Sequence, residues 1–415
     1  MAEGKESGER MGKGSVGREG KLLLYFVIFF EAPVRQEGDF FVAEQKKYNI
    51  LALSCLLMHK QCLYHLHKAF YSDPSGQMLF CAILVGLFLN KKLCIGRKDM
   101  KVGIIGAGSV GSATAFALIM RGVARKVVLI DANEKRAMAE AMDIAHATPF
   151  AYANKVKYGT YEDLAGAEVV IITAGANQKP GETRIDLLGR NVKIFESIIP
   201  QVVAAAPNTT LLITANPADI MTEVALKLSG FPKERVIGSG TVLDTSRFRT
   251  LLGYHLGVSP KSIHANVLGE HGDSEVLIWS NGDAGTVQIE ELARMEGKPF
   301  TAEVKAEIDD CVRNAAYKII DGKGATFYGI AGALCRICQA ITTNEYAILT
   351  VSSHHDDVEG VKDVCLSLPT VVGKRGVHSV IYPKLSDSEH HDLKLSAEKI
   401  KEYSDQALEI IAKNA

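Results

Sequence analysis

Residues 267–273, Val-Leu-Gly-Glu-His-Gly-Asp, place a histidine between two glycines directly after an apolar, strand-like run. Glycine lets the backbone approach a ligand closely, and imidazole is the side chain that gains and loses a proton near neutral pH. The segment therefore offers His271 as a general acid and base. A histidine alone is weak support for catalysis, because most histidines lie at the surface or are satisfied within a core.

Residues 244–247, Asp-Thr-Ser-Arg, place an acid and an arginine three positions apart at the start of an amphipathic helical pattern. Residues with this spacing lie on one face of a helix. A buried aspartate beside an imidazole orients the ring and stabilises its charged form. Arginine presents a planar fork of donors that grips a carboxylate, which lysine does not. Asp244 and Arg247 thus have the chemistry to assist a histidine that acts on a carboxylate-bearing molecule.

Residues 176–184 form a polar segment with a Pro-Gly turn, and a helical pattern follows over residues 185–206. A loop of this kind can close over a cleft, exclude water and bring Arg184 to a carbonyl oxygen on which negative charge develops. The alternative is that Arg184 merely begins a solvated helix face. Taken by itself, the segment favours that alternative.

Nearer the N-terminus, a glycine-rich turn joins a strand-like run, residues 102–105, to a helical pattern. Residues 106–111 read Gly-Ala-Gly-Ser-Val-Gly. In a dinucleotide-binding turn the first glycine permits a tight turn, the second lets the backbone approach the pyrophosphate, and the third lets helix pack on strand. Gly106, Gly108 and Gly111 fit these roles, and the helix N-terminus that follows would hold the phosphates.

A second strand-like run, residues 126–130, ends on Asp131, twenty residues after Gly111. An acid at this place accepts hydrogen bonds from the adenosine ribose and repels a 2′-phosphate, so the sequence predicts NAD in preference to NADP. A glycine-rich turn alone would be weak support, but strand, helix, second strand and acid in register make it strong. A flavodoxin-like turn without a nucleotide is the alternative.

Two further strand-like runs are followed by residues that could line the ligand-binding edge of a parallel sheet. Residues 168–173 lead to Gly175 and Ala176, and residues 210–214 lead to Asn216. Strands that alternate with helices form a doubly wound parallel sheet, which binds its ligands at the carboxyl ends of the strands. We therefore expect a Rossmann-type α/β fold in which Gly175 and Ala176 contact the cofactor.

The composition is that of an ordinary soluble globular protein. The 415 residues suffice for two domains, with 47% hydrophobic and 23% charged residues, and a net charge of -1 does not favour nucleic acid as a partner. We interpret the eight cysteines as free thiols in a reducing compartment, Cys335 and Cys338 included despite their redox-like spacing. The histidine pairs at residues 354–355 and 390–391 are predicted to be solvated surface residues, because no third metal ligand is evident, and no metal site is expected.

Residues 1–98 differ in pattern from the rest of the chain. Their apolar patches, residues 22–30, 50–58 and 78–89, are each shorter than the ~18 residues that span a bilayer, so a membrane partner is not expected. Met100 is followed at once by a complete strand-like run. We interpret residues 1–98 as a disordered or spurious extension, a hypothesis that loss of folding or activity in a chain expressed from Met100 would contradict.

Five motifs together resemble the bacterial L-lactate dehydrogenases of the lactate/malate dehydrogenase family. The resemblance runs from about residue 100 to the C-terminus in order and with the family's spacing, and residues 1–98 have no counterpart in it. The motifs are Gly-Ala-Gly-Ser-Val-Gly at 106–111, Gly-Ala-Asn-Gln-Lys-Pro-Gly-Glu-Thr-Arg at 175–184, Asn-Pro at 216–217, Gly-Ser-Gly-Thr-Val-Leu-Asp-Thr-Ser-Arg at 238–247 and Gly-Glu-His-Gly-Asp at 269–273.

The resemblance implies an NAD-binding Rossmann domain over residues 99–240 and an α+β substrate and catalytic domain over residues 241–415. It implies reversible hydride transfer between NADH and pyruvate to give L-lactate, in glycolysis and fermentation, by a cytoplasmic homotetramer. In this family His271 would donate and accept the proton and Asp244 would hold its ring. Arg247 would grip the substrate carboxylate, while Arg184 would polarise the ketone.

Other positions gain expected roles from the same resemblance. Malate dehydrogenases carry arginine at the position of Gln178, where it pairs with a second carboxylate, so the uncharged Gln178 favours pyruvate. Asn216 would contact the substrate or the nicotinamide, and Val110 would join the glycine loop around the cofactor. Thr326 would bound the pocket near the substrate methyl group, although a hydroxyl at a helix start explains it nearly as well.

Arg249 and His264 match positions that form a basic cluster between subunits in the bacterial enzymes that fructose 1,6-bisphosphate activates. Their presence predicts activation by that sugar phosphate. Two alternatives remain open at this point. One is a dehydrogenase for another 2-oxo acid, malate or a branched-chain analogue, and the other is a membrane-tethered binding protein that uses residues 1–98.

Overall fold

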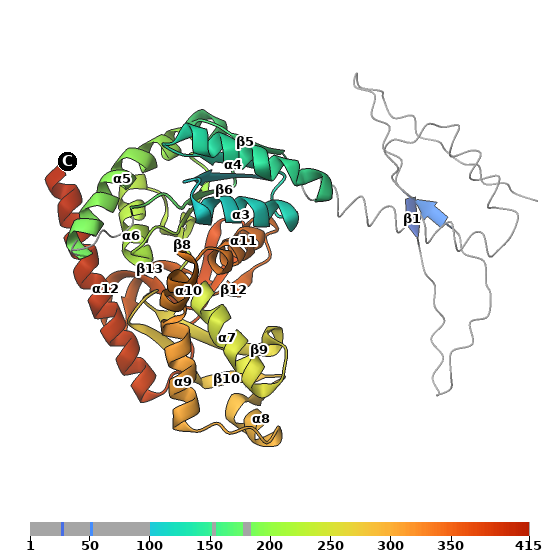
Figure 1. Cartoon of the computed structure of the whole chain (residues 1–415), viewed down its shortest axis with the longest axis vertical. Coiled ribbons are helices and arrows are strands. Elements are labelled where there is room, and N and C mark those ends of the chain that lie inside the picture. The colour runs from blue at the N-terminus through green and yellow to red at the C-terminus, as the bar shows by residue number, and fades with distance from the viewer. Residues whose placement is uncertain (1–25, 29–49, 53–99, 152–154, 177–183, 415) are drawn as a thin grey trace, which may run out of the picture. The chain divides into compact units, whose positions relative to one another are not determined.

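The computed structural model describes residues 26–28, 50–52, 100–151, 155–176 and 184–414. The chain divides into two units, Met1–Gly96 and Arg97–Ala415. In the first unit, β1 (Phe26–Ile28) pairs antiparallel with β2 (Ile50–Ala52) (Figure 1). The predicted disordered start and most of the apolar patches lie outside the described residues. No helix in the described part of the chain is long and apolar enough to cross a membrane.

Six parallel strands form the first half of the main sheet, in the order β5-β4-β3-β6-β7-β8. The chain starts in the middle at β3, builds outward on one side, and then returns to build outward on the other. The sheet is therefore doubly wound, as predicted, with its switch point between β3 and β6. The strands are β3 (Lys101–Ile105), β4 (Lys126–Ile130), β5 (Lys155–Tyr158), β6 (Val169–Ile172), β7 (Thr210–Ile213) and β8 (Val236–Gly238).

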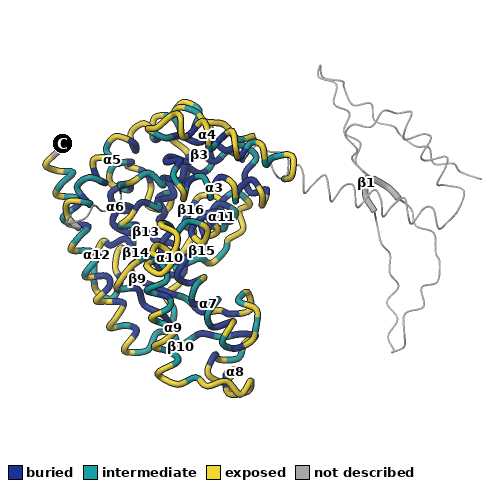
Figure 2. The backbone as a smooth tube through the Cα atoms, viewed as in Figure 1, coloured by how far each residue is buried: buried dark blue, intermediate teal, exposed yellow. Residues whose placement is uncertain are grey.

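Two hydrophobic cores cover the two faces of this sheet. On β6, Val170 and Ile172 face one core while Val169 and Ile171 face the other. Alternate side chains of a strand point to opposite faces, so a strand buried on both faces reads as a continuous apolar run. Helices α5, α6 and α12 pack on the first face, and α3, α4 and α11 on the second (Figures 1 and 2). These elements are α3 (Ser109–Met120), α4 (Glu134–His146), α5 (Arg184–Ala205), α6 (Ala218–Ser229), α11 (Tyr328–Thr342) and α12 (Asp387–Asn414), with short helices η1 (Thr148–Phe150), η2 (Tyr161–Leu164) and η3 (Lys233–Arg235).

The second half of the sheet is antiparallel and continues from β8 in the order β8-β13-β14-β9-β10-β11. The sequence thus forms an α/β Rossmann half and a second half that mixes antiparallel strands with helices, which confirms the predicted fold class. The strands are β9 (Ile263–Gly269), β10 (Glu275–Ala284), β11 (Val287–Gln288), β13 (Ser352–Val358) and β14 (Val361–Ser367). A separate sheet contains β12 (Ala347–Leu349), β15 (Thr370–Gly373) and β16 (Gly376–Val380).

A third core lies between helix α7 (Val242–Leu256) and the strands β9 and β10. In this core Phe248 packs edge-on against Trp279, with ring centroids 4.7 Å apart. The core fixes the helix that carries Asp244 against the strand that leads to His271. The remaining elements of this half are α8 (Ile289–Met295), α9 (Ala302–Arg313), α10 (Ala315–Lys323) and η4 (Pro260–Ser262).

The structure corrects the prediction that the histidines at 354 and 355 are solvated. Both lie on β13, and the side chain of His355 is buried with its Nε2 3.1 Å from the carbonyl oxygen of Leu366. Burial lowers the pKa of His355 to about 4, so this ring is neutral. The prediction was wrong because neighbouring acids and serines suggested exposure, whereas strand pairing with β14 decides burial. At the start of α12, His391 is exposed, and His390 lies 2.8 Å from Glu359.

Candidate active site

In the loop between β3 and α3, a different physical constraint explains each of the three glycines. Gly106 has a φ of +104°, and a Cβ there would lie 2.6 Å from Thr173 Oγ1. A Cβ on Gly111 would lie 1.9 Å from the carbonyl oxygen of Gly106, so helix and strand could not pack as they do. At Gly108 no described atom would lie within 4 Å of an added Cβ. Internal packing therefore leaves Gly108 open to a molecule from outside.

Asp131 lies beside this loop at the end of β4. One carboxylate oxygen accepts a hydrogen bond from the backbone N–H of Ala107 at 2.6 Å, and the other accepts one from Asn133 at 2.8 Å. Val110, on the first turn of α3, is half-buried and packs against the core. The structure thus brings together the glycine, valine and aspartate residues that the sequence analysis named for cofactor binding.

Asn191 links the segments that follow β6 and β7. The sequence analysis did not identify this residue. It lies fully buried on α5, where its Oδ1 accepts from the N–H of Ala176 at 2.7 Å and its Nδ2 donates to the carbonyl of Asn216 at 2.8 Å. Gly175 packs closely here, because a Cβ would lie 3.1 Å from that of Ala215. An amide side chain within the apolar face of a long helix was the signal that could have identified Asn191.

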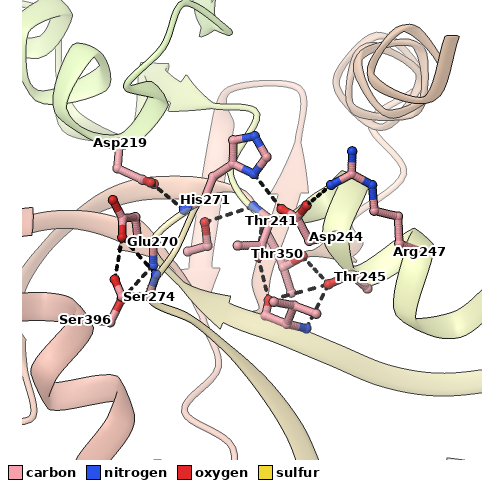
Figure 3. Close-up of polar contacts among 12 residues, drawn as sticks. Asp219, Thr241, Asp244, Thr245, Arg247, Glu270, His271, Ser274, Thr350 and Ser396 are labelled. Atoms are coloured by element: carbon pink, nitrogen blue, oxygen red, sulfur yellow. Dashed lines mark hydrogen bonds and ion pairs between the residues drawn. The ribbon is translucent and has the colours of Figure 1, made fainter. Parts of the chain in front are cut away.

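His271, Asp244 and Arg247 form a chain of hydrogen bonds at the centre of the site (Figure 3). His271 Nδ1 lies 2.6 Å from Asp244 Oδ2, and Arg247 Nη1 donates to Asp244 Oδ1 at 2.8 Å. The Asp244 side chain is 1% exposed, whereas those of His271 and Arg247 are 23% and 15% exposed. A carboxylate only accepts, so Nδ1 carries the proton, and Nε2 is left as the atom that can exchange a proton with a ligand.

The electrostatics of this pair favour a charged histidine. The negative charge of Asp244 raises the pKa of His271 to about 9, with burial acting in the opposite direction. Burial acts to raise the pKa of Asp244, but the charges of His271 and Arg247 and the hydrogen bond from His271 outweigh it and hold that pKa below its usual value. The imidazolium is thus stabilised where a proton donor is needed.

Buried threonines fix α7 against β9, and with it Asp244 against His271. Thr241 Oγ1 donates to the carbonyl of Val267 at 2.5 Å, and the N–H of Val267 donates to Thr245 Oγ1 at 2.9 Å. Thr241 and Thr245 flank Asp244 at the start of the helix (Figure 3). The hydrogen bonds of Thr241 and Thr245 to Val267 therefore help to set the distance between Asp244 and His271.

The loop that carries His271 is held from its other side. The N–H of His271 donates to Asp219 Oδ2 on α6 at 2.8 Å, and that of Glu270 donates to Ser396 Oγ on α12 at 2.9 Å. Gly269 has a φ of +82°, and a Cβ there would lie 2.6 Å from Ser396 Oγ. Glycine is thus required where the loop turns onto α12.

Glu275 is a second residue that the sequence analysis did not find. It is 4% exposed at the start of β10, and one of its carboxylate oxygens lies within 4.8 Å of a carboxylate oxygen of Asp244 and a ring nitrogen of His271. Its Oε1 has no hydrogen-bond partner among the described residues. Burial raises the pKa of Glu275 to about 8, with Asp244 adding to the effect. Burial thus favours the protonated form of this carboxyl, in which it adds no negative charge beside Asp244. Its signal in the sequence was an acid at the first position of an apolar strand.

The structure gives less detail for several predicted site residues. Residues 177–183, which include Gln178, lie outside the described residues, and Arg184 is the first residue of α5. Thr326 is half-buried in the connection between α10 and α11. Arg249 contacts the residues that follow His264 on β9: its Nε donates to the carbonyl of Ala265 at 2.8 Å and its Nη2 to Asn266 Oδ1 at 3.0 Å, while His264 is exposed.

Comparisons with known proteins bear on this site. A model of the NAD-binding domain of lactate/malate dehydrogenases matches residues 100–238, and a model of their α/β C-terminal domain matches residues 241–411. The chain belongs to the lactate/malate dehydrogenase family. This confirms the resemblance drawn from the sequence, together with the predictions of NAD as cofactor and of an oxidoreductase.

Several L-lactate dehydrogenases are similar to this chain over most of their own length. The L-lactate dehydrogenase of Thermus aquaticus is 55% identical over 302 residues, which cover 73% of this chain and 97% of that protein. The L-lactate dehydrogenase of Allorhizobium ampelinum is 54% identical over 73% of this chain and 98% of its own. The crystal structure of the minor L-lactate dehydrogenase from Enterococcus mundtii, in a ligand-bound form, matches with a TM-score of 0.72 and 40% identity, over 74% of this chain and 98% of that one.

The glycine loop fits the cofactor that the family uses. Among the described residues none caps the N-terminus of α3 with a side chain, and its first turn contains no acid, so its N–H groups can face an anion. The open space at Gly108 lies at this terminus. Gly108, Val110 and Gly111 would face the pyrophosphate of NAD at this terminus, Gly106 would form the turn that brings them there, and Asp131 would hold the adenosine ribose.

Proposed function

We propose that this chain is an L-lactate dehydrogenase in which His271 transfers the proton between pyruvate and L-lactate. The observation that carries the proposal is the 2.6 Å contact between His271 Nδ1 and the buried Asp244, which leaves Nε2 for the substrate oxygen. The names of the similar proteins support the choice of substrate. We place the enzyme in the cytoplasm, because the cysteines of the described ranges are all free thiols. A place in glycolysis and fermentation is what the family resemblance implies.

The chain's own residues divide the remaining work. Arg247 uses one N–H on Asp244, and its other donors can grip the substrate carboxylate. His271, charged, donates its Nε2 proton to the ketone oxygen as pyruvate is reduced, and the neutral ring accepts it back as lactate is oxidised. When bound, the nicotinamide supplies or accepts the hydride. Arg184, the first residue of α5, would polarise the ketone oxygen, as the family resemblance implies.

The pH dependence of the two directions should be opposite. Pyruvate reduction needs the charged ring, so kcat/KM for pyruvate should fall as the pH rises through about 9, where His271 loses its proton. Lactate oxidation needs the neutral ring, so its kcat/KM should rise over the same range. Steady-state rates from pH 6 to 10 provide the measurement, with His255→Gln as the matched control, a histidine in the last turn of α7 whose ring contacts Pro299. Parallel profiles would exclude His271 as the proton carrier.

Substrate choice should depend on Gln178. An oxaloacetate bound in a closed site would leave its second carboxylate unpaired, at a cost of several kcal/mol. We expect Gln178→Arg to shift the ratio of kcat/KM for oxaloacetate to that for pyruvate about a hundredfold, which corresponds to about 3 kcal/mol. Gln201→Arg, at an exposed position of α5, is the control. A panel of pyruvate, oxaloacetate and 2-oxoisocaproate would also identify a branched-chain preference, and an unchanged ratio would refute this role.

Fructose 1,6-bisphosphate should activate a homotetramer through Arg249 and His264. Facing cations from two subunits repel each other, and two phosphates would relieve that repulsion. The effector should lower KM for pyruvate about fivefold or more, and Arg249→Gln should abolish the response. Arg294→Gln, on the exposed face of α8, should respond as the unaltered chain does. A KM that ignores the effector would disprove the proposal, and sedimentation gives the assembly state.

A further inference from the structure

Away from the active site, three potential metal ligands converge from three elements. Cys365 on β14 donates its thiol hydrogen to Glu223 Oε2 on α6 at 2.8 Å, and His354 Nδ1 on β13 lies 3.2 Å from the same oxygen. The sulfur, the ring nitrogen and the carboxylate oxygen all lie within 4.8 Å of one another. None of the three takes part in the proposed reaction.

The cluster is largely shielded from water. Cys365 is fully buried, and the side chains of Glu223 and His354 are 13% and 15% exposed. A carboxylate is costly to bury unless a positive charge compensates it. Its closest partners here are a thiol and an imidazole, which are also the side chains that zinc prefers. Burial acts to raise the pKa of Glu223, but the hydrogen bonds from His354 and Cys365 and the positive charges of His354 and Lys401 hold it below its usual value. A divalent cation bound by all three side chains would add to this compensation.

The other nitrogen of the His354 ring faces carboxylates. Nε2 lies 3.9 Å from Asp356 Oδ1 and 3.8 Å from Asp363 Oδ1. Histidines that bind a metal usually direct their second N–H to a carboxylate, which orients the ring and makes the ligating nitrogen more basic. At these separations Nε2 makes no hydrogen bond to either aspartate, but both carboxylates lie on its side of the ring, and Nδ1 lies on the side of Glu223 and Cys365.

We propose that Glu223, His354 and Cys365 bind one zinc-like divalent cation, with water completing a tetrahedral site. With metal–ligand bonds of about 2.0–2.3 Å, the nitrogen and oxygen ligands would lie about 3.3 Å apart and the sulfur and oxygen about 3.5 Å apart. The distance between His354 Nδ1 and Glu223 Oε2 is already 3.2 Å. The distance between Cys365 Sγ and Glu223 Oε2, now 2.8 Å, would have to increase by less than about 1 Å. Binding releases the thiol proton of Cys365 to solvent, so the sulfur binds as thiolate.

The site would fasten α6 to the β13–β14 hairpin. Asp219, whose carboxylate accepts from the N–H of His271, lies one helical turn before Glu223 on α6. The cation would therefore stabilise the helix that holds the catalytic loop while taking no part in the reaction. The inference does not depend on which 2-oxo acid the enzyme uses.

Cobalt binding to the full-length chain tests the proposal. After chelator treatment, the chain is titrated with Co²⁺, and the thiolate-to-cobalt charge-transfer band and bound equivalents are measured. Cys365→Ala and His354→Gln should each bind one equivalent less and lose this band. Cys338→Ala, a buried thiol on α11, and His390→Gln, a carboxylate-paired histidine on α12, are the matched controls. Cysteines of residues 1–98 contribute equally to every chain, so the differences report the site.

Two further readouts make the outcome decisive. Zn²⁺ should raise the thermal unfolding midpoint by a few degrees in the unaltered chain and both controls, but not in Cys365→Ala or His354→Gln. Asp363→Asn should weaken Co²⁺ binding about tenfold. If Cys365→Ala does not fold, as judged by circular dichroism, His354→Gln decides. Equal binding by all variants would overturn the proposal, as would binding that depends on His354 and Asp363 but not on Cys365.

Discussion

The burial of Asp244 is the constraint on which the rest of the structure depends. A carboxylate that is 1% exposed is stable only if it is paired, and its partners are His271 and Arg247. Removal of one partner of a buried ion pair costs about 3–5 kcal/mol, so neither partner can move freely. The pairing raises the pKa of His271 to about 9 and holds Arg247 where a carboxylate can reach it. Structure and proposed chemistry therefore rest on the same contacts.

The continuous sheet explains how the two halves of the chain build one site. The cofactor loop follows β3 in the parallel half, and the His271 loop follows β9 in the antiparallel half. The halves join through the β13–β14 hairpin, where Ser352 pairs with Gly238 and Ser367 pairs with Gly269. Gly269, at the start of the His271 loop, is thus registered directly against the hairpin. The proposed cation site lies on the same hairpin and would reinforce this junction.

Local patterns were enough to predict the parallel sheet and the cofactor edge. The runs at 101–105, 126–130, 168–173 and 210–214 are apolar because parallel strands are buried on both faces. Strand β5 was missed because Lys-Val-Lys-Tyr is charged and mostly exposed at the sheet edge, and β8 because it has three residues. The glycine roles are also local, since a turn's φ and the contact of Gly111 with Gly106 arise within six residues.

Long-range contacts account for what the sequence did not predict. Asn191 matters because it links Ala176 and Asn216, and Glu275 because its strand end meets Asp244. His354 reads as a surface residue until α6 and β14 bring Glu223 and Cys365 to it. The pairing of His271 with Asp244 spans 27 positions of sequence; the chemistry of the two side chains suggested it, and the family resemblance assigned the partners.

A nitrogen-15 NMR titration of His271 tests the central claim most directly. In the free enzyme, labelled at histidine and assigned with His271→Gln, the ring should titrate near pH 9, and the neutral form should carry its proton on Nδ1. In Asp244→Asn the largest of the charges that raise this pKa is removed, while burial and the smaller effects of Asp219 and Glu275 remain, so the ring should titrate well below 9. A ring that titrates near 6.5 in the unaltered chain, or whose pKa is the same in Asp244→Asn, would contradict the account.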